Sequence, residues 1–333
     1  MQITKMTGSM AALLMSLSSM SAYAEENDVE TVAKIVDIQH ELFNGPHEGM
    51  RAVHAKGVVL KGDFYPDESA SRISKAEHFN NDDATPIVVR FSNGTGIPDI
   101  ADNDPRGIIK GMAVRFSLED DEYTDLVLSS VPRFPASTPK EFLQFMTAVK
   151  KSANSEESPT PLKKYIQENP AAKAFAEYPK PVPASFAVLS YHSINAFKFT
   201  NELGQSVYGR YIVEPYEDEK MLGQKVAGEQ NNDYLMNEIR ERLPRELVKF
   251  HLKLQIANEN DEVDDATVIW PESREVFELG TIVIEAVKGN ALEYERKTMF
   301  NPLALPEGIE PSDDPILLAR PAAYAVSFQH RAE

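Results

Sequence analysis

The sequence predicts an α+β fold in which an antiparallel, barrel-like sheet of eight strands carries flanking helices. Strand-like segments recur from about residue 50 and are separated by clusters of Gly, Asp, Asn and Pro. Most connections between them are too short for the crossover that joins parallel strands, so neighbouring strands should pair antiparallel. The composition, with 42% hydrophobic and 26% charged residues, is that of an ordinary globular protein.

Eight segments are predicted to be strands, four on each side of a helical stretch. The first four span residues 54–65, 85–93, 110–119 and 123–130, and the last four span residues 194–201, 205–215, 250–259 and 277–287. The fifth and sixth segments flank the short sequence Glu-Leu-Gly at 202–204, which predicts a hairpin.

The helical stretch covers residues 136–180. It contains a helix over 138–152, with Thr138 as N-cap and Pro139 at the first helical position. A second helix is expected over 233–250, broken near Pro244, and the last helix follows Pro315 or Pro321. No internal repeat or linker separates these elements, so residues 25–333 are expected to form a single domain.

The first 24 residues are predicted to be a secretory signal peptide. Lys5 gives a positively charged start, a short apolar run follows, and Ala22-Tyr23-Ala24 fits a cleavage site. The apolar run is too short to span a membrane stably. We therefore expect a periplasmic protein that has no membrane attachment after cleavage.

Charge and composition exclude several classes of function. The formal net charge is −18, which disfavours binding to nucleic acid or to anionic lipid. The chain has no cysteine, which excludes disulfides, cysteine zinc sites, iron–sulfur clusters and thiol catalysis. The seven histidines show no metal-ligand spacing, so a zinc or copper site held by histidines is not expected.

The C-terminal segment carries Arg320, Tyr324 and Arg331, which share one face of an α-helix. An arginine beside a tyrosine favours the phenolate, and tyrosine is one of the proximal ligands of haem iron. On this segment alone, an amphipathic helix with surface arginines is the favoured interpretation. His54, between Val53 and Ala55 at the start of a strand, is likewise compatible with a buried core histidine.

Five separated motifs together resemble the haem catalases, in order and at compatible distances. They are Arg51-Ala-Val-His54-Ala-Lys-Gly57, Val89-Arg90-Phe91-Ser92, Asp104-Pro-Arg106-Gly107, Asp125-Leu-Val, and the Arg320, Tyr324, Arg331 set. The resemblance covers residues 40–331 and is strongest to the short, exported catalase-related peroxidases. It implies a catalase-like eight-stranded barrel and haem b as the cofactor.

The resemblance also implies a role for each matching residue. Tyr324 would be the axial iron ligand, with its phenolate stabilised by Arg320. His54 would be the distal acid–base residue, oriented by Ser92. The residues implied to contact the porphyrin or its propionates are Arg51, Val53, Arg90, Phe134, Phe142 and Arg331.

Two of these assignments have a structural alternative. Phe142 also lies on the apolar stripe of its predicted helix, so packing explains it equally well. Asp104 and Arg106 are expected to form a structural turn pair rather than to act in catalysis.

The sequence departs from the catalase pattern on the distal side. Catalases carry an asparagine within a Gly-Asn-Asn run, whereas this chain has Leu128-Ser129-Ser130, with Ser129 at the matching position. A hydroxyl offers a single donor, so peroxide would be held less firmly. The long C-terminal region of large catalases is missing after Tyr324, and we expect a monomer or a small homo-oligomer.

We therefore expect a haem-dependent peroxidase that uses hydrogen peroxide or an organic hydroperoxide to oxidise small organic donors. We also expect weak catalase activity and a role in peroxide detoxification. Three alternatives remain open at this point: a true catalase, an enzyme that rearranges fatty-acid hydroperoxides, and a non-catalytic periplasmic haem carrier. Only the carrier would have no need of His54.

Overall fold

The computed structural model describes residues 26–81 and 83–332. The predicted signal peptide, residues 1–24, lies outside the described residues. Within the described part, none of the helices is long and apolar enough to cross a lipid bilayer.

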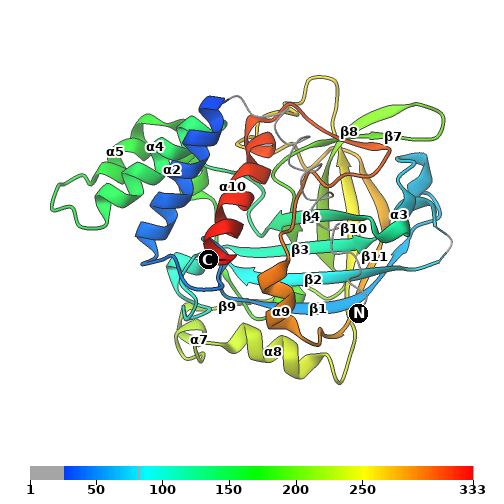
Figure 1. The fold of residues 1–333 in the computed structure, drawn as a ribbon, viewed down its shortest axis with the longest axis horizontal. Coiled ribbons are helices and arrows are strands. Elements are labelled where there is room, and N and C mark those ends of the chain that lie inside the picture. Colours follow the sequence, from blue (N-terminus) through cyan, green and yellow to red (C-terminus); the bar gives the residue numbers. More distant parts are fainter. Residues whose placement is uncertain (1–25, 82, 333) are drawn as a thin grey trace, which may run out of the picture.

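Eight antiparallel strands form a closed barrel, which confirms the predicted fold class (Figure 1). Around the barrel the strands follow the order β10, β11, β1, β2, β3, β4, β6 and β8, and pairing between β8 and β10 closes the ring. Their bounds are β1 (Gly57–Pro66), β2 (Thr85–Asn93), β3 (Lys110–Ser117), β4 (Tyr123–Ser129), β6 (Tyr191–His192), β8 (Ser206–Pro215), β10 (Val248–Ile256) and β11 (Val276–Val287).

One predicted barrel strand lies outside the ring. The segment predicted at 194–201 is β7 (Phe197–Thr200), which forms the expected hairpin with β8 and also pairs with β12 (Ile309–Pro311). The eighth barrel strand is instead β6, whose two residues are too few to show a pattern in the sequence. A separate small sheet contains β5 (Val182–Pro183) and β9 (Met221–Leu222).

Helices gather on one side of the barrel. There, α2 (Glu26–Leu42) packs against α4 (Pro139–Ser152) and α10 (Pro315–Ala332), and α5 (Pro161–Glu168) packs on α4 (Figure 1). The other helices are α3 (Glu77–Asn80), α6 (Pro170–Glu177), α7 (Gln224–Gly228), α8 (Tyr234–Arg242) and α9 (Ala291–Lys297). Short 3-10 turns span Ala70–Arg72, Pro105–Gly107, Glu119–Asp121 and Phe186–Val188.

The predicted bounds of the helix over 138–152 are correct, and the last helix begins at Pro315, one of the two expected positions. The helix expected over 233–250 needs revision. Thr138 caps α4 by accepting a hydrogen bond from the Glu141 N–H at 3.2 Å. The helix expected over 233–250 ends at Arg242, and the segment from Val248 onward belongs to β10. Val248 pairs with β11 inside the barrel wall, so tertiary burial overrides the helical pattern.

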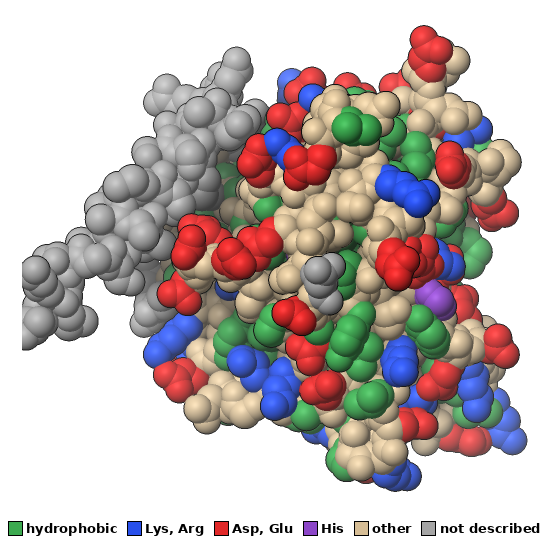
Figure 2. Space-filling view, turned by 90° about the vertical axis from the view of Figure 1, so that its right-hand side faces the viewer, with side chains coloured by type: hydrophobic (Ala, Val, Ile, Leu, Met, Phe, Trp, Pro, Cys, Tyr) green, Lys and Arg blue, Asp and Glu red, His purple; other side chains and the backbone are tan. Residues whose placement is uncertain are grey.

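The barrel interior is the hydrophobic core. Leu60, Phe91, Val114, Phe250 and Ile284 point inward from five different strands and are all 0% exposed. Burial of each such side chain is worth about 1.5–3 kcal/mol. On the outside, acidic side chains are interspersed with lysine and arginine over the face shown in Figure 2, as expected from the acidic composition.

Candidate active site

The floor of the candidate site is a row of three small residues across neighbouring strands. Ser92 on β2 pairs with Gly111 on β3, which in turn pairs with Ser129 on β4. Paired residues in a sheet project from the same face. A Cβ atom on Gly111 would lie 2.8 Å from Nδ1 and Cε1 of His54, so the His54 imidazole lies directly over this row. Glycine is therefore required at position 111.

His54 is held in a defined and strained position. Its Nδ1 hydrogen-bonds Ser92 Oγ at 3.0 Å, as the resemblance implied. Its backbone has a φ of +61°, a left-handed conformation that costs about 1–3 kcal/mol in a non-glycine residue and is typical of functional sites. Burial lowers the pKa of His54 to about 3, with the positive charges of Arg90 and Arg51 acting in the same direction. The imidazole is therefore neutral near pH 7 and can accept a proton.

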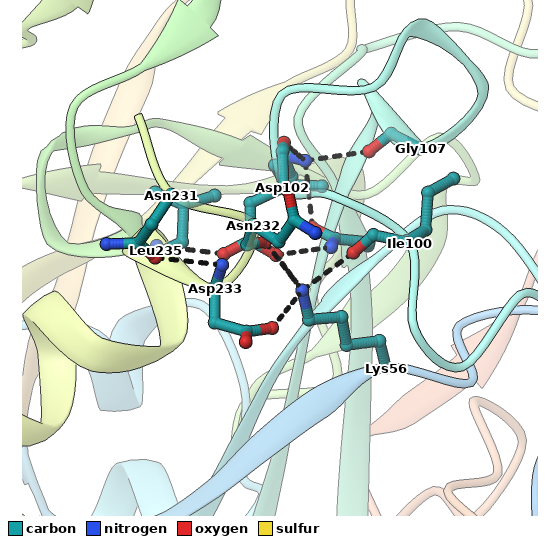
Figure 3. A network of polar contacts seen from close by, with 10 residues as sticks. Lys56, Ile100, Asp102, Gly107, Asn231, Asn232, Asp233 and Leu235 are labelled. Carbon is teal, nitrogen blue, oxygen red and sulfur yellow. Dashed lines mark hydrogen bonds and ion pairs between the residues drawn. The ribbon is translucent and has the colours of Figure 1, made fainter. Parts of the chain in front are cut away.

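The chain after His54 is anchored by Lys56 (Figure 3). Its ammonium donates to the carbonyls of Ile100 at 2.7 Å and Asn232 at 2.9 Å. It also ion-pairs with Asp102 at 2.8 Å and Asp233 at 2.7 Å. Lys56 thereby ties the start of β1 to two loops below the site.

A second lysine supports the floor from the other side of the sheet. Lys110 pairs with Asn93 across β2 and β3, one position away from the Ser92–Gly111 pair. Its fully buried ammonium donates to Asn93 Oδ1 at 2.8 Å and to the carbonyls of Asp102 and Gly107 at 2.7 Å. Because alternate residues of a strand face opposite ways, this contact fixes the strands beneath His54 without entering the site.

The opposite wall comes from α10. Arg320 donates to the Tyr324 hydroxyl oxygen twice, from Nε at 3.0 Å and from Nη2 at 2.9 Å. Its third nitrogen, Nη1, donates to Asn195 Oδ1 at 2.8 Å, and Asn195 in turn donates to Asp314 at 2.7 Å. Two charge-assisted bonds onto one phenolic oxygen hold that oxygen in place as an electron-rich acceptor.

The two walls are in direct contact. The backbone N–H of Ala52, two residues before His54, donates to Ser327 Oγ at 3.0 Å. Ser327 lies almost one turn after Tyr324 on α10. The helix with the Arg320–Tyr324 pair therefore packs against the segment with His54, and the structure brings together residues far apart in the sequence.

Three arginines surround this junction. Glu295 on α9 pairs with Arg51 at 2.5 Å and with Arg90 at 3.1 Å. Arg51 and Arg331 each donate to the Thr298 carbonyl at 3.1 Å. Burial lowers the pKa of Arg51 to about 9 and that of Arg331 to about 10, and their mutual repulsion with Arg90 adds to this.

The arginine cluster leaves donors unpaired. Nε of Arg90, and Nε and Nη1 of Arg331, are buried without a hydrogen-bond partner. Unsatisfied buried donors are rare in native proteins and call for an explanation. Acceptors from a bound anion, such as the two propionates of haem b, would satisfy them. The residues present thus fit a haem: a tyrosine oxygen, an imidazole on the neighbouring segment, and guanidiniums for the propionates.

The remaining predicted residues lie at the edges of this site. The rings of Phe134 and Phe142 are 4.6 Å apart and both are half-buried. Val53 precedes His54 in the same bend and is also half-buried. Ser129 is at the end of the floor row, where its hydroxyl accepts a hydrogen bond from the Val131 N–H at 3.1 Å.

The turn pair has the structural role expected of it. Asp104 caps the 3-10 turn that follows it and pairs with Arg106 at 2.7 Å. The Arg106 side chain is 66% exposed. This pair therefore shapes a surface turn.

Sequence reasoning missed four residues that complete the site. Gly111, Asn195 and Glu295 each lie against a predicted residue of another element, and Ser327 contacts the backbone of Ala52, next to Arg51. Only Gly111 had a local signal, because a glycine inside a strand often marks a close approach. The others act through contacts between distant segments, which one sequence does not reveal.

Comparison with known proteins agrees with this geometry. The sequence model of the family described as "Catalase" matches residues 27–333, and the chain belongs to that family. It is 31% identical to the catalase-related peroxidase of Mycolicibacterium paratuberculosis, over 86% of this chain and 90% of that protein. It is 28% identical to the catalase-related peroxidase of Synechococcus elongatus, over 86% of this chain and 85% of that protein.

Solved catalases share the fold. Catalase A from Saccharomyces cerevisiae superposes with a TM-score of 0.76 at 23% identity, covering 87% of this chain and 63% of that one. A fungal catalase gives a TM-score of 0.75, also at 23% identity, with 61% of its chain covered. The chain thus spans less than two-thirds of the length of these two catalases.

Proposed function

We propose that this protein is a haem b peroxidase that uses hydrogen peroxide or an organic hydroperoxide to oxidise small organic donors, with weak catalase activity. The observation that carries the proposal is the double hydrogen bond from Arg320 to the Tyr324 hydroxyl oxygen. This oxygen is held in place as a candidate iron ligand, and the neutral His54 belongs to the segment that packs against the same helix. A bound haem supplies the redox-active iron that accepts the oxidising equivalents of peroxide.

The residues of the chain supply proton transfer and orientation. His54 accepts a proton from one oxygen of the peroxide and returns it to the other oxygen as the O–O bond breaks. Ser92 fixes the imidazole through Nδ1, so Nε2 is the nitrogen that performs the transfer. Positioned acid–base catalysis of this kind contributes about 10²- to 10⁴-fold in rate.

Ser129 favours the peroxidase over a true catalase. Its hydroxyl is at the end of the floor row and already accepts a backbone hydrogen bond from Val131. One short donor positions a second peroxide less firmly than a carboxamide does. The names of the two catalase-related peroxidase relatives support the same choice.

An absorption spectrum with a tyrosine variant tests the cofactor assignment. Purified protein with added haem should show a high-spin ferric band, which Tyr324→Phe should lose or shift. Tyr65→Phe, the same substitution at a tyrosine of β1 that is 48% exposed, is the matched control and should retain the band. A wild-type protein that fails to bind haem would refute the proposal.

A comparison of two activities tests the reaction. The wild-type protein should oxidise phenolic dyes faster than it releases oxygen from peroxide, and His54→Ala should lower dye oxidation by about 10²- to 10⁴-fold. Oxygen release far above dye oxidation would favour the true catalase. Unchanged dye oxidation in His54→Ala would favour the carrier.

We also propose that the protein acts in the periplasm in peroxide detoxification. The signal-like residues 1–24 support export. N-terminal sequencing of the protein from a periplasmic fraction should begin at Glu25. A start at Met1 in the cytoplasm would contradict this location.

A further inference from the structure

The arginine cluster contains one negatively charged side chain, and that side chain comes from α9. Glu295 Oε2 contacts Arg51 Nη1 at 2.5 Å and Arg90 Nη2 at 3.1 Å. Its side chain is 18% exposed, compared with 16% for Arg51 and 3% for Arg90. Glu295 is thus built into the cluster rather than resting on its surface.

The position of Glu295 depends on the local structure of α9. Asn290, in a left-handed conformation with a φ of +55°, turns the chain from β11 into this short helix. The helix then directs Glu295 inward, while Glu293 is 61% exposed and pairs with Lys297. Three residues later, the Thr298 carbonyl accepts hydrogen bonds from Arg51 and from Arg331.

The charges in the cluster do not balance without a ligand. Arg51, Arg90 and Arg331 carry three positive charges, and Glu295 carries one negative charge. Among the described residues the net charge of this cluster is therefore +2, in a largely buried location where the electrostatic energy is high. Two carboxylates would neutralise it, and the unpaired nitrogens of Arg90 and Arg331 are donors available to them.

We propose that Glu295 is a specificity-determining residue that sets this cluster at a net charge of +2 and so matches it to a ligand edge with two carboxylates. The inference rests on the proposed function, because haem b has such an edge. Glu295 and the ligand carboxylates share the same guanidiniums, so they oppose one another. Its carboxylate limits how tightly an anionic edge binds, and it stabilises the arginines before the ligand arrives.

This role predicts that the Glu295 carboxylate opposes the binding of a ligand that carries carboxylates more than the binding of a ligand that lacks them. Haem and its dimethyl ester share the same ring and iron, but only haem carries the carboxylates. Removing the Glu295 charge should therefore strengthen binding of haem relative to the ester. A purely structural role for Glu295 would weaken both ligands equally.

The test measures dissociation constants of haem and of haem dimethyl ester by absorbance titration, with the full chain and its Glu295→Gln variant. We expect the preference for haem over the ester to rise about tenfold in Glu295→Gln, within the usual range of coupling between sites. Glu293→Gln, the same substitution on the exposed side of the helix, should leave the preference unchanged. Glu295→Asp keeps the charge and should stay within about twofold of the wild type. If Glu295→Gln does not fold, Glu295→Met, which also removes the charge, takes its place.

The outcomes separate the two proposals. If the wild type binds both ligands and Glu295→Gln leaves the preference unchanged or lowers it, Glu295 does not set the cluster charge. A preference that changes as much in Glu295→Asp as in Glu295→Gln would also overturn the inference, because the charge is then not responsible. If the wild type binds neither ligand, the proposed function itself fails.

Discussion

Two buried polar clusters are built on strand β2, one on each face. Arg90 belongs to the cluster with Arg51, Arg331 and Glu295, and Asn93 belongs to the network of Lys56, Lys110 and Asp102. Both combine several cations with fewer buried carboxylates. In the lysine network each ammonium has at least three oxygen acceptors, whereas the arginine cluster retains three unpaired nitrogens. The difference indicates that the lysine network is structural and that the arginine cluster is prepared for a ligand.

The structural role of the lysine network can be tested most directly at Asp102. This 0% exposed carboxylate accepts from Lys56, from Asn93 at 2.8 Å and from the Leu235 N–H at 2.9 Å. Asp102→Asn leaves two buried lysines with less negative charge beside them. Removal of one partner from a buried ion pair costs about 3–5 kcal/mol. Asp102→Asn should lower the free energy of unfolding by this amount, as measured by urea unfolding of haem-free protein.

A matched change in the arginine cluster is the control. Arg331→Met removes a buried cation whose one hydrogen-bond acceptor among the described residues is the Thr298 carbonyl. The change therefore relieves repulsion as well as losing a bond. Its cost should stay within about 1 kcal/mol. If the two variants lose equal stability, the distinction between a structural and a ligand-binding cluster is wrong.

His78 sharpens the comparison, because its Nδ1 is also buried without a partner. Its ring packs among Phe64, Phe79 and Phe116, and burial alone lowers the pKa of His78 to about 3. It is therefore neutral near pH 7. An unpaired atom on a neutral ring surrounded by phenylalanines indicates core packing, whereas an unpaired atom on a charged guanidinium indicates a site.

The His78 pKa shift gives a pH dependence with a definite sign. Below pH 6.5 the unfolded chain binds a proton at this ring and the folded protein does not, so stability falls as the pH drops from about 6.5 toward 3. Between pH 6.5 and 4.5 this ring accounts for a loss of about 2–3 kcal/mol. His78→Leu should reduce the acid-induced loss of stability in urea titrations at these two pH values. An unchanged loss would show that His78 is protonated in the folded protein.

How far the sequence predicts the structure depends on the range of each interaction. Local patterns located seven of the eight barrel strands and the start of α4, because strand alternation and helix caps are properties of adjacent residues. The pattern failed at β6, which is a strand only because β4 and β8 flank it.

The candidate site shows the same difference between residues with a local sequence signal and residues that depend on long-range contacts. The family motifs identified Tyr324, His54 and the three arginines, and the structure brings these segments together. Glu295 and Asn195 carry no comparable local signal, because each acts on an arginine more than a hundred residues away. Their roles became evident only from contacts in the folded chain.

The last expected effect concerns ligand binding by the arginine cluster itself. Arg331→Met removes two of the three unpaired nitrogens, so a ligand carboxylate loses a charge-assisted partner. Such a bond contributes about 1.5–3 kcal/mol, so haem binding should weaken by about tenfold or more. Binding of the dimethyl ester should change far less, because it has no carboxylate to lose.

The lysine network supplies the control for this measurement. Asp102→Asn, although it lowers stability more, should leave the preference for haem over the ester unchanged, since its charges face away from the site. An equal change of the preference for haem over the ester in Asp102→Asn and Arg331→Met would mean that the two clusters are energetically coupled through β2. The two clusters would then differ in their hydrogen bonding but not in their function.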